Sequence, residues 1–202
     1  MLWMGLTGSI GSGKSTVSEI LRTKNWPVID ADHLAKEVVQ ADSTGEAKVL
    51  KAFGPIVADA QGRLDRKKMA SVVFSDSEKL SLLESIVHPL VQEKTKQGRA
   101  DLERAGYALA FYDVPLLFEK KLEAQFDGLV VVFADLETCI RRVMARSAWT
   151  REEATSRIRT QLSVEEKIKK SHWVVRNNGT RQELVVEVDK LIHDIGRKFP
   201  RI

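Results

Sequence analysis

Short continuous runs of apolar residues alternate with longer, more polar segments along this chain of 202 residues. Runs of this length are typical of buried strands, and the segments between them have the spacing of amphipathic helices. Strands that alternate with helices predict an α/β fold with a parallel sheet. The five predicted strands are Leu2–Thr7, Pro27–Asp30, Ala108–Val114, Leu129–Ala134 and Trp173–Val175.

Helix starts are predicted at several points. After the first strand, Val17, Ile20 and Leu21 share one helix face, which predicts a helix from Lys14 to about Asn25. Later helices begin with the capping-box pattern, in which a Ser or Thr precedes a Glu by three residues. These pairs are Ser43 with Glu46, Ser75 with Glu78, Thr150 with Glu153, Ser163 with Glu166 and Thr180 with Glu183.

Two helical segments interrupt the alternation. Residues from about 44 to 104 contain no convincing strand, and we interpret them as a helical insertion. Residues from about 147 to 170 are densely charged and lie between the fourth and fifth strands, where a mobile lid is expected. No repeat or linker rich in Pro and Gly separates these segments from the rest. We therefore expect one domain over residues 1–202.

Residues Gly8–Ser15 match the pattern Gly-x-x-x-x-Gly-Lys-Ser between a predicted strand and a predicted helix. Glycines at the turns let backbone N–H groups face phosphate oxygens, and the start of the helix adds positive potential. Lys14 supplies a cation for the β- and γ-phosphates, and the Ser15 hydroxyl can ligate Mg²⁺. The alternative is an ordinary Gly-rich turn. The motif predicts a nucleoside triphosphate site without choosing among GTPases, ATPases and kinases.

Composition, charge and sequence patterns reduce the number of protein classes that fit the chain. The 32 basic and 28 acidic residues are interleaved and leave a net charge of +4, a pattern typical of solvated helix faces rather than of a nucleic-acid surface. A single cysteine, Cys139, favours a reducing compartment, and no apolar run approaches a membrane span, so we expect a cytoplasmic protein. None of the three asparagines is followed by Lys, so the Asn-Lys-x-Asp pattern of GTP-binding switches is absent.

Carboxylates at two strand ends are candidates for chemistry. Asp30 and Asp32 follow the second apolar run, where one of them can orient or deprotonate an acceptor hydroxyl. Both can also cap the helix that begins near His33, and the two roles do not exclude each other. Asp113 ends the third run and resembles the carboxylate that holds Mg²⁺ in P-loop enzymes, although a turn before Pro115 is the alternative.

Six arginines flank the turn of the predicted lid, and charge on a transferring phosphoryl group requires such cations. Arg142 and Arg146 are four residues apart and share a helix face. We expect most of the six to form a solvated helix surface and at least one to reach ATP. The six are Arg141, Arg142, Arg146, Arg151, Arg157 and Arg159.

Taken together, the motifs resemble those of the dephospho-CoA kinase family over nearly the whole chain. The resemblance rests on Gly5–Thr16, Asp30–Asp32, Gly62–Arg66, Leu83–Pro89 and Val114–Glu119. It continues beyond the fourth strand through Arg142, Arg146, Ala154, Arg157, Ile158, Gln161, Lys167 and Asn177–Gly179. The chain departs from the family at His172 and Arg176, two positions that are commonly acidic in relatives.

This resemblance implies a P-loop NTPase three-layer fold with a five-stranded parallel sheet, a helical substrate-binding insertion and a helical lid. It implies ATP-dependent phosphorylation of the ribose 3′-hydroxyl of dephospho-CoA, the last step of coenzyme A biosynthesis, with Mg²⁺. The implied partner is the small-molecule substrate, with no nucleic acid, no membrane and no obligate protein partner.

Roles for individual residues follow from the same resemblance. Asp32 is the expected general base, and Lys14 and Arg146 complete the catalytic set. The ATP-binding set is Gly8, Gly11, Ser12, Gly13, Lys14, Ser15, Thr16, Arg142, Arg146 and Asn177. The substrate-binding set is Asp32, His88, Pro115, Leu116 and Glu119, and the metal set is Ser15 and Asp113. Spacing alone favours a core position for His88, whereas the family match favours the substrate pocket. Cys139, Trp26, Trp149 and Trp173 are interpreted as structural.

Overall fold

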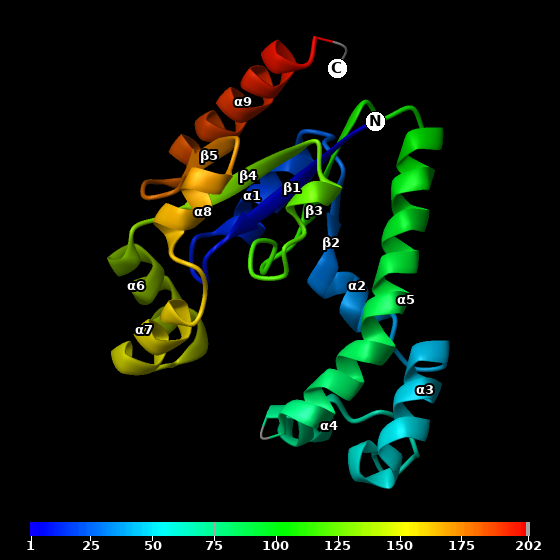
Figure 1. Ribbon diagram of the computed structural model, residues 1–202. Coiled ribbons are helices and arrows are strands. Elements are labelled where there is room, and N and C mark those ends of the chain that lie inside the picture. Colours follow the sequence, from blue (N-terminus) through cyan, green and yellow to red (C-terminus); the bar gives the residue numbers. More distant parts are fainter. Residues whose placement is uncertain (75, 201–202) are drawn as a thin grey trace. The chain divides into compact units, whose positions relative to one another are not determined.

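The computed structural model describes residues 1–74 and 76–200, and the chain divides into two compact units (Figure 1). The first unit comprises residues 1–29 and 102–202, and the second comprises residues 30–101. The strands are β1 (Leu2–Gly8), β2 (Val28–Asp30), β3 (Leu109–Asp113), β4 (Gly128–Phe133) and β5 (Trp173–Arg176). The helices are α1 (Lys14–Thr23), α2 (Ala31–Glu37), α3 (Thr44–Phe53), η1 (Gly54–Val57), α4 (Arg66–Phe74), α5 (Ser77–Arg104), η2 (Glu123–Gln125), α6 (Leu136–Ser147), α7 (Arg151–Arg159), α8 (Val164–Lys170) and α9 (Arg181–Lys198).

The strands form one sheet in the order β2-β3-β1-β4-β5, and the pairs β1–β3, β1–β4 and β4–β5 are parallel. All five predicted strands are confirmed, and no end differs from its prediction by more than one residue. In the central strand, Leu6 lies beside Asp113 of β3 and Gly8 lies beside Val132 of β4. The loop after β1 therefore starts between two neighbouring strand ends, where parallel sheets bind ligands.

Helices α1 and α9 cover one face of this sheet. Their apolar side chains pack with the strand residues that point to that face, which include Met4, Leu6, Phe111, Val130 and Val132. The helix residues in this core are Val17, Ile20 and Leu21 of α1 and Leu184, Val188, Leu191 and Ile195 of α9. The predicted apolar face of α1 is thus the face that anchors the helix to the sheet.

The segment that follows β3 covers the other face. A side chain at Gly5 would meet Leu117 at 2.7 Å and Phe126 at 3.0 Å, so this segment packs directly on the middle of β1. Trp3 stacks on Tyr112 with 5.6 Å between ring centroids. The first unit therefore has three layers, with helices on one side of the sheet and the segment after β3 on the other.

The second unit is helical and has a small core of Val49, Val57 and Met69. Its buried Glu46 carboxylate accepts hydrogen bonds from Leu64 N (3.0 Å) and Asp42 N (2.7 Å). The Leu64 N–H is the main reason that the pKa of Glu46 lies below its ordinary value of 4.5. Arg63 also reaches this carboxylate, at 3.3 Å. Residues Gly62–Arg66, which are part of the family resemblance, thus connect two segments of this unit through Arg63 and Leu64.

Helix ends follow the predicted pattern with local differences. The capping boxes at Thr150 and Thr180 have both expected hydrogen bonds, one from each partner's backbone N–H to the other's side chain. At Ser43, the Glu46 side chain instead accepts a hydrogen bond from Asp42 N. Ser43 and Ser163 still cap their helices, and the predicted pair at Ser75 lies outside the described residues. Helix α1 ends at Thr23 rather than near Asn25, because Asn25 takes a left-handed conformation with φ of 61°. Over the described ranges, no helix has both the length and the apolarity needed to cross a membrane.

Candidate active site

The loop between β1 and α1 requires glycine at two positions. Gly11 and Gly13 have φ of 81° and 86°, in the left-handed region that strains other residues. A side chain at Gly11 would also approach the Cys139 carbonyl oxygen at 2.6 Å, and one at Gly13 would collide with the amide of Asn177. The sequence motif therefore reflects both backbone conformation and close packing against α6 and the end of β5.

The start of α1 is arranged to receive an anion. Gly13 is its N-cap and provides no side-chain hydrogen bond, so the N–H groups of Lys14 and Ser15 at the start of the helix keep their capacity to donate to a ligand. The Ser12 hydroxyl is buried, and within residues 1–74 and 76–200 it has no hydrogen-bond partner. Unused donors beside a helix N-terminus fit the phosphate oxygens of a nucleotide.

Lys14 and Asp113 form an ion pair at the base of this loop. Asp113 is 1% exposed, and its second oxygen accepts a hydrogen bond of 2.7 Å from the Ser18 hydroxyl. Because Ser18 lies four residues after Lys14 on α1, both side chains reach the same carboxylate from one helix face. Spacing on the predicted helix could have identified Ser18, which the motif does not include.

Arg142 and Asn177 meet at the carbonyl oxygen of Ser12. Asn177 Nδ2 donates to it at 2.7 Å, and an Arg142 guanidinium nitrogen lies 3.4 Å from it. The other terminal nitrogen of Arg142 lies 3.4 Å from Asn177 Oδ1. Arg146, one turn further along α6, is exposed, and its Nε donates to the Ser147 hydroxyl at 3.4 Å. The structure thus brings two predicted ATP-binding side chains to the phosphate loop.

Ser15 and Thr16 occupy the first turn of α1, and Ser15 is exposed. A hydroxyl in this position fits Mg²⁺, which prefers oxygen ligands and keeps several waters. No group of three His, Cys, Asp or Glu side chains gathers in the described part of the chain. A magnesium ion here would therefore depend on Ser15, water and substrate phosphates, with the Asp113 carboxylate beside Lys14.

The predicted acceptor-side residues are distributed over both units. Asp30 caps α2 by accepting from His33 N at 3.0 Å, whereas Asp32 lies in the first turn of that helix. In the first unit, the Pro115 carbonyl accepts from the Thr7 hydroxyl at 3.1 Å, and Leu116 is partly exposed. Capping is therefore observed for Asp30, which leaves the catalytic assignment of Asp32 as a prediction.

The Glu119 carboxylate contacts Leu162, just before α8, and Lys167 within it. Its Oε1 accepts from Leu162 N at 3.0 Å and lies 2.9 Å from the ammonium of Lys167, which is fully buried. Burial acts to raise the pKa of Glu119, but the Lys167 ammonium and the Leu162 N–H outweigh it and hold the pKa below its ordinary value. These contacts favour a structural task for this carboxylate, and its predicted contact with substrate stays a prediction.

His88 lies on an exposed face of α5. Its side chain is 47% exposed, and Nε2 is 3.6 Å from a carboxylate oxygen of Glu84, one turn earlier. The core position that spacing alone favours is therefore wrong. Apolar neighbours in the sequence suggested burial, but no residue of α5 is buried.

The two departures from the family, His172 and Arg176, contact the sheet beside them. His172 Nδ1 accepts from Leu129 N at 3.1 Å, and the Arg176 guanidinium carbon lies 5.8 Å from the centroid of the Phe133 ring. Asn177, the next residue, keeps its hydrogen bond to the phosphate loop. These replacements therefore add contacts to β4 without displacing the residue at the nucleotide site.

The residues interpreted as structural are packed as expected. Cys139 is buried, and burial raises the pKa of its thiol to about 11. Trp26 and Trp173 pack against the main core, and Trp149 packs against the cluster of Ile140, Val143 and Ala154. The thiol therefore stays protonated at neutral pH and is a poor nucleophile.

A glycine loop between the first parallel strand and its helix, with a lysine in the first turn and a carboxylate on the neighbouring strand, defines the class of P-loop phosphotransferases and related NTPases. The fold alone is also shared with a solved structure of low sequence identity. A shikimate kinase from Acinetobacter baumannii superimposes with a TM-score of 0.52 at 15% identity over 96% of this chain and 94% of that chain.

Residues 2–183 match the family model described as dephospho-CoA kinase, and this chain belongs to that family. A dephospho-CoA kinase from Bdellovibrio bacteriovorus is 44% identical over 192 residues, which cover 95% of each chain. The solved structure of a dephospho-CoA kinase from Campylobacter jejuni has a TM-score of 0.73 at 27% identity and covers 97% of this chain and 98% of that chain. The predictions of family and fold class are confirmed.

Proposed function

We propose that this chain transfers the γ-phosphoryl group of ATP to the ribose 3′-hydroxyl of dephospho-CoA, which yields coenzyme A and ADP. One observation carries the proposal: a phosphate loop with Lys14 paired to Asp113 lies in a chain that matches the dephospho-CoA kinase family over residues 2–183. The loop supplies the donor half of the reaction, and family membership supplies the acceptor.

On the donor side, the N–H groups of the loop and of the first turn of α1 bind the β- and γ-phosphates, and Lys14 neutralises charge on them. Arg142 and Asn177 hold the Ser12 end of the loop and contact the nucleotide. Arg146 reaches the transferring phosphoryl group and stabilises its charge in the transition state. Gly8, Gly11, Gly13 and Thr16 complete the loop that wraps the phosphates.

On the acceptor side, Asp32 orients the 3′-hydroxyl and accepts its proton. The bond between the 3′-oxygen and the γ-phosphorus forms while the bond between that phosphorus and the β–γ bridging oxygen breaks, and ADP leaves with the bonding electrons. His88, Pro115, Leu116 and Glu119 bind dephospho-CoA. In this proposal the segment of about 44–104 carries acceptor-binding residues, and the segment of about 147–170 acts as a lid over ATP.

Mg²⁺ fits the hydroxyl of Ser15, and when bound it supplies charge neutralisation between the β- and γ-phosphates. Both oxygens of Asp113 are engaged, one by Lys14 and one by Ser18. Asp113 would therefore support the ion through its negative charge while it holds Lys14 and Ser18. The proposed location is the cytoplasm, where ATP is abundant and the single buried thiol of Cys139 needs no disulfide partner.

A coupled assay of ADP formation tests the proposal. Purified protein is supplied with ATP and Mg²⁺ and with dephospho-CoA, shikimate, gluconate or a panel of nucleosides as acceptor. Among these acceptors, we expect turnover only with dephospho-CoA. The product should carry the new phosphate on the ribose 3′-oxygen, and mass spectrometry and phosphorus NMR identify that position. Turnover of another acceptor, with none of dephospho-CoA by folded protein, would overturn it.

A further inference from the structure

One contact to the phosphate loop comes from Gln161, a residue to which the sequence motifs assign no role. The backbone N–H of Ile10, in the middle of the loop, donates to the side-chain carbonyl oxygen of Gln161 at 2.9 Å. Gln161 lies two residues beyond the end of α7, and it is separated from Ile10 by 151 positions in the chain. Because a peptide N–H and the preceding carbonyl share one plane, this bond sets the orientation of the peptide between Ser9 and Ile10.

The side chain of Ile10 is held by the same part of the molecule. It packs against the cluster of Ile140, Val143 and Ala154 together with Ile158, which lies one turn before Gln161. The side chain of Ile10 is thus held by α6 and α7, and its backbone is held by Gln161. Ser12, two residues further along the loop, is held separately by Asn177.

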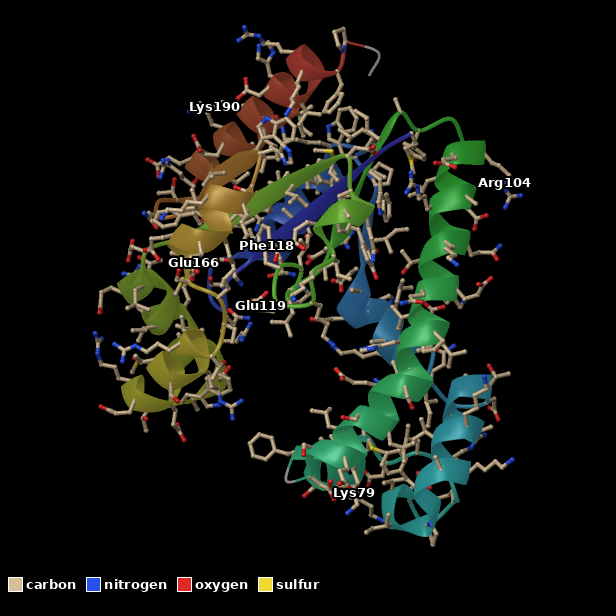
Figure 2. The ribbon with its side chains drawn as sticks, viewed as in Figure 1. Lys79, Arg104, Phe118, Glu119, Glu166 and Lys190 are labelled. Carbon is tan, nitrogen blue, oxygen red and sulfur yellow. The ribbon has the colours of Figure 1, made fainter. Side chains whose placement is uncertain are left out.

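The segment that carries Gln161 has its own anchor. The next residue, Leu162, donates its N–H to Glu119 Oε1 at 3.0 Å, and the buried ammonium of Lys167 lies 2.9 Å from the same oxygen. Figure 2 shows Glu119 on the loop that follows β3, next to Phe118, which is buried. A buried ammonium persists only when a carboxylate compensates its charge, so Lys167 and Glu119 keep this connection in place.

We propose that Gln161 is a positioning residue for ATP: its side-chain carbonyl fixes the Ser9–Ile10 peptide of the phosphate loop, and the pair of Glu119 and Lys167 fixes the segment that carries Gln161. A loop whose peptide groups are already held in one orientation loses less conformational freedom on binding phosphate. This assignment rests on the proposed function for its kinetic test, but its binding test needs ATP alone.

Gln161→Met tests the hydrogen bond, because methionine keeps the length and apolar contacts of the side chain and lacks the acceptor oxygen. We expect the Kd for ATP and the KM for ATP to rise about fivefold to tenfold, the effect of one well-placed hydrogen bond. The KM for dephospho-CoA and the Kd for adenosine, which has no phosphates for the loop, should stay within about twofold of wild type. Gln182→Met, on the exposed surface of α9, is the matched control.

A purely structural role predicts a different result. In that case the Tm of Gln161→Met falls while the Kd for ATP of the folded protein stays at the wild-type value, and this outcome would overturn the proposal. An unchanged Kd with an unchanged Tm would overturn it as well. Should Gln161→Met fail to fold, Lys167→Met together with Glu119→Gln removes the buried charges, keeps an acceptor for Leu162, and should raise the Kd for ATP by about threefold.

The two proposals fail separately. Absence of turnover with dephospho-CoA in the wild-type protein removes the proposed function and leaves the ATP titration of Gln161→Met intact. A wild-type enzyme that phosphorylates dephospho-CoA, together with a Gln161→Met variant that binds ATP normally, removes only the positioning role.

Discussion

The phosphate loop and the helical unit of residues 30–101 are held by different kinds of contact. Side chains far away in the sequence hold the loop: Gln161 bonds Ile10, and Asn177 bonds Ser12. The helical unit depends on contacts over shorter sequence separations, such as Glu46 with Leu64, and on a core of few residues. The donor side is therefore preformed by the sheet unit, whereas the predicted acceptor residues Asp32 and His88 lie on helices of a more lightly packed unit.

This difference predicts that substitutions in the two regions affect different properties of the protein. Substitutions in the phosphate loop should impair phosphate binding and phosphoryl transfer. Because the loop is packed on several sides, neighbouring residues cannot shift to compensate. Changes within the helical unit should instead alter acceptor chemistry or the stability of that unit.

Lys14→Ala should have the largest effect, because it removes the cation that stabilises the transferring phosphoryl group. We expect kcat to fall by at least about a hundredfold, measured by the coupled ADP assay at saturating substrates. Lys190→Ala, on α9, is the control and should leave kcat unchanged; Figure 2 labels this residue. A Lys14→Ala enzyme with near-normal kcat would contradict the donor half of the site.

Asp32→Asn should also lower kcat by at least about a hundredfold if this carboxylate accepts the hydroxyl proton. Asp30→Asn, two residues earlier at the N-cap, is the matched comparison and should be milder, because asparagine caps a helix as well as aspartate does. Steady-state rates of both variants, with circular dichroism to verify folding, decide the assignment. Near-normal kcat in Asp32→Asn would mean that the base lies elsewhere.

Arg146→Ala should lower kcat by about tenfold to a hundredfold, since its guanidinium is proposed to stabilise charge on the phosphoryl group. The measurement is kcat with both substrates varied in turn. Arg141→Ala, on the same helix but a different face, serves as the control. An effect confined to the KM for dephospho-CoA would place Arg146 on the acceptor side and contradict its proposed role at the phosphoryl group of ATP.

Glu46→Gln should produce the smallest effect, a fall in Tm of about 2–5 °C at neutral pH without a large change in kcat. The folded-state pKa of Glu46 lies below 4.5, so its ionised form stabilises the protein above that pH. This contribution is lost as the pH falls through the folded-state pKa. The Tm difference between wild type and variant should therefore be largest above pH 4.5 and disappear in stronger acid.

Glu93→Gln, an exposed position on α5, is the control for that experiment. A Tm difference between wild type and Glu46→Gln that does not change with pH would show that shape, rather than charge, accounts for the effect. A kcat lowered as strongly as in Lys14→Ala would show that the two regions are less independent than their contacts indicate.

Local signals were sufficient for much of this fold. Apolar runs located every strand because burial in a parallel sheet demands continuous hydrophobicity, and glycine spacing located the phosphate loop because only glycine tolerates the left-handed turn at Gly11 and Gly13. The capping pattern at Thr150 and Thr180 was also local. His88 shows the limit of such signals, since apolar neighbours along a helix do not establish that a core lies against it.

The sequence by itself determined the strands, the phosphate loop and Lys14, because each depends on residues close together in the chain. It also determined the family, because the resemblance is carried by a series of short motifs, each of which can be recognised without the tertiary structure. Only the tertiary structure decided what holds the loop. Gln161 reaches Ile10, Asn177 reaches Ser12, and Asp113 reaches Lys14 and Ser18, across separations of 95 to 165 residues. Side chains that distant meet only after the sheet and its helices have packed, so no local pattern encodes the pairing.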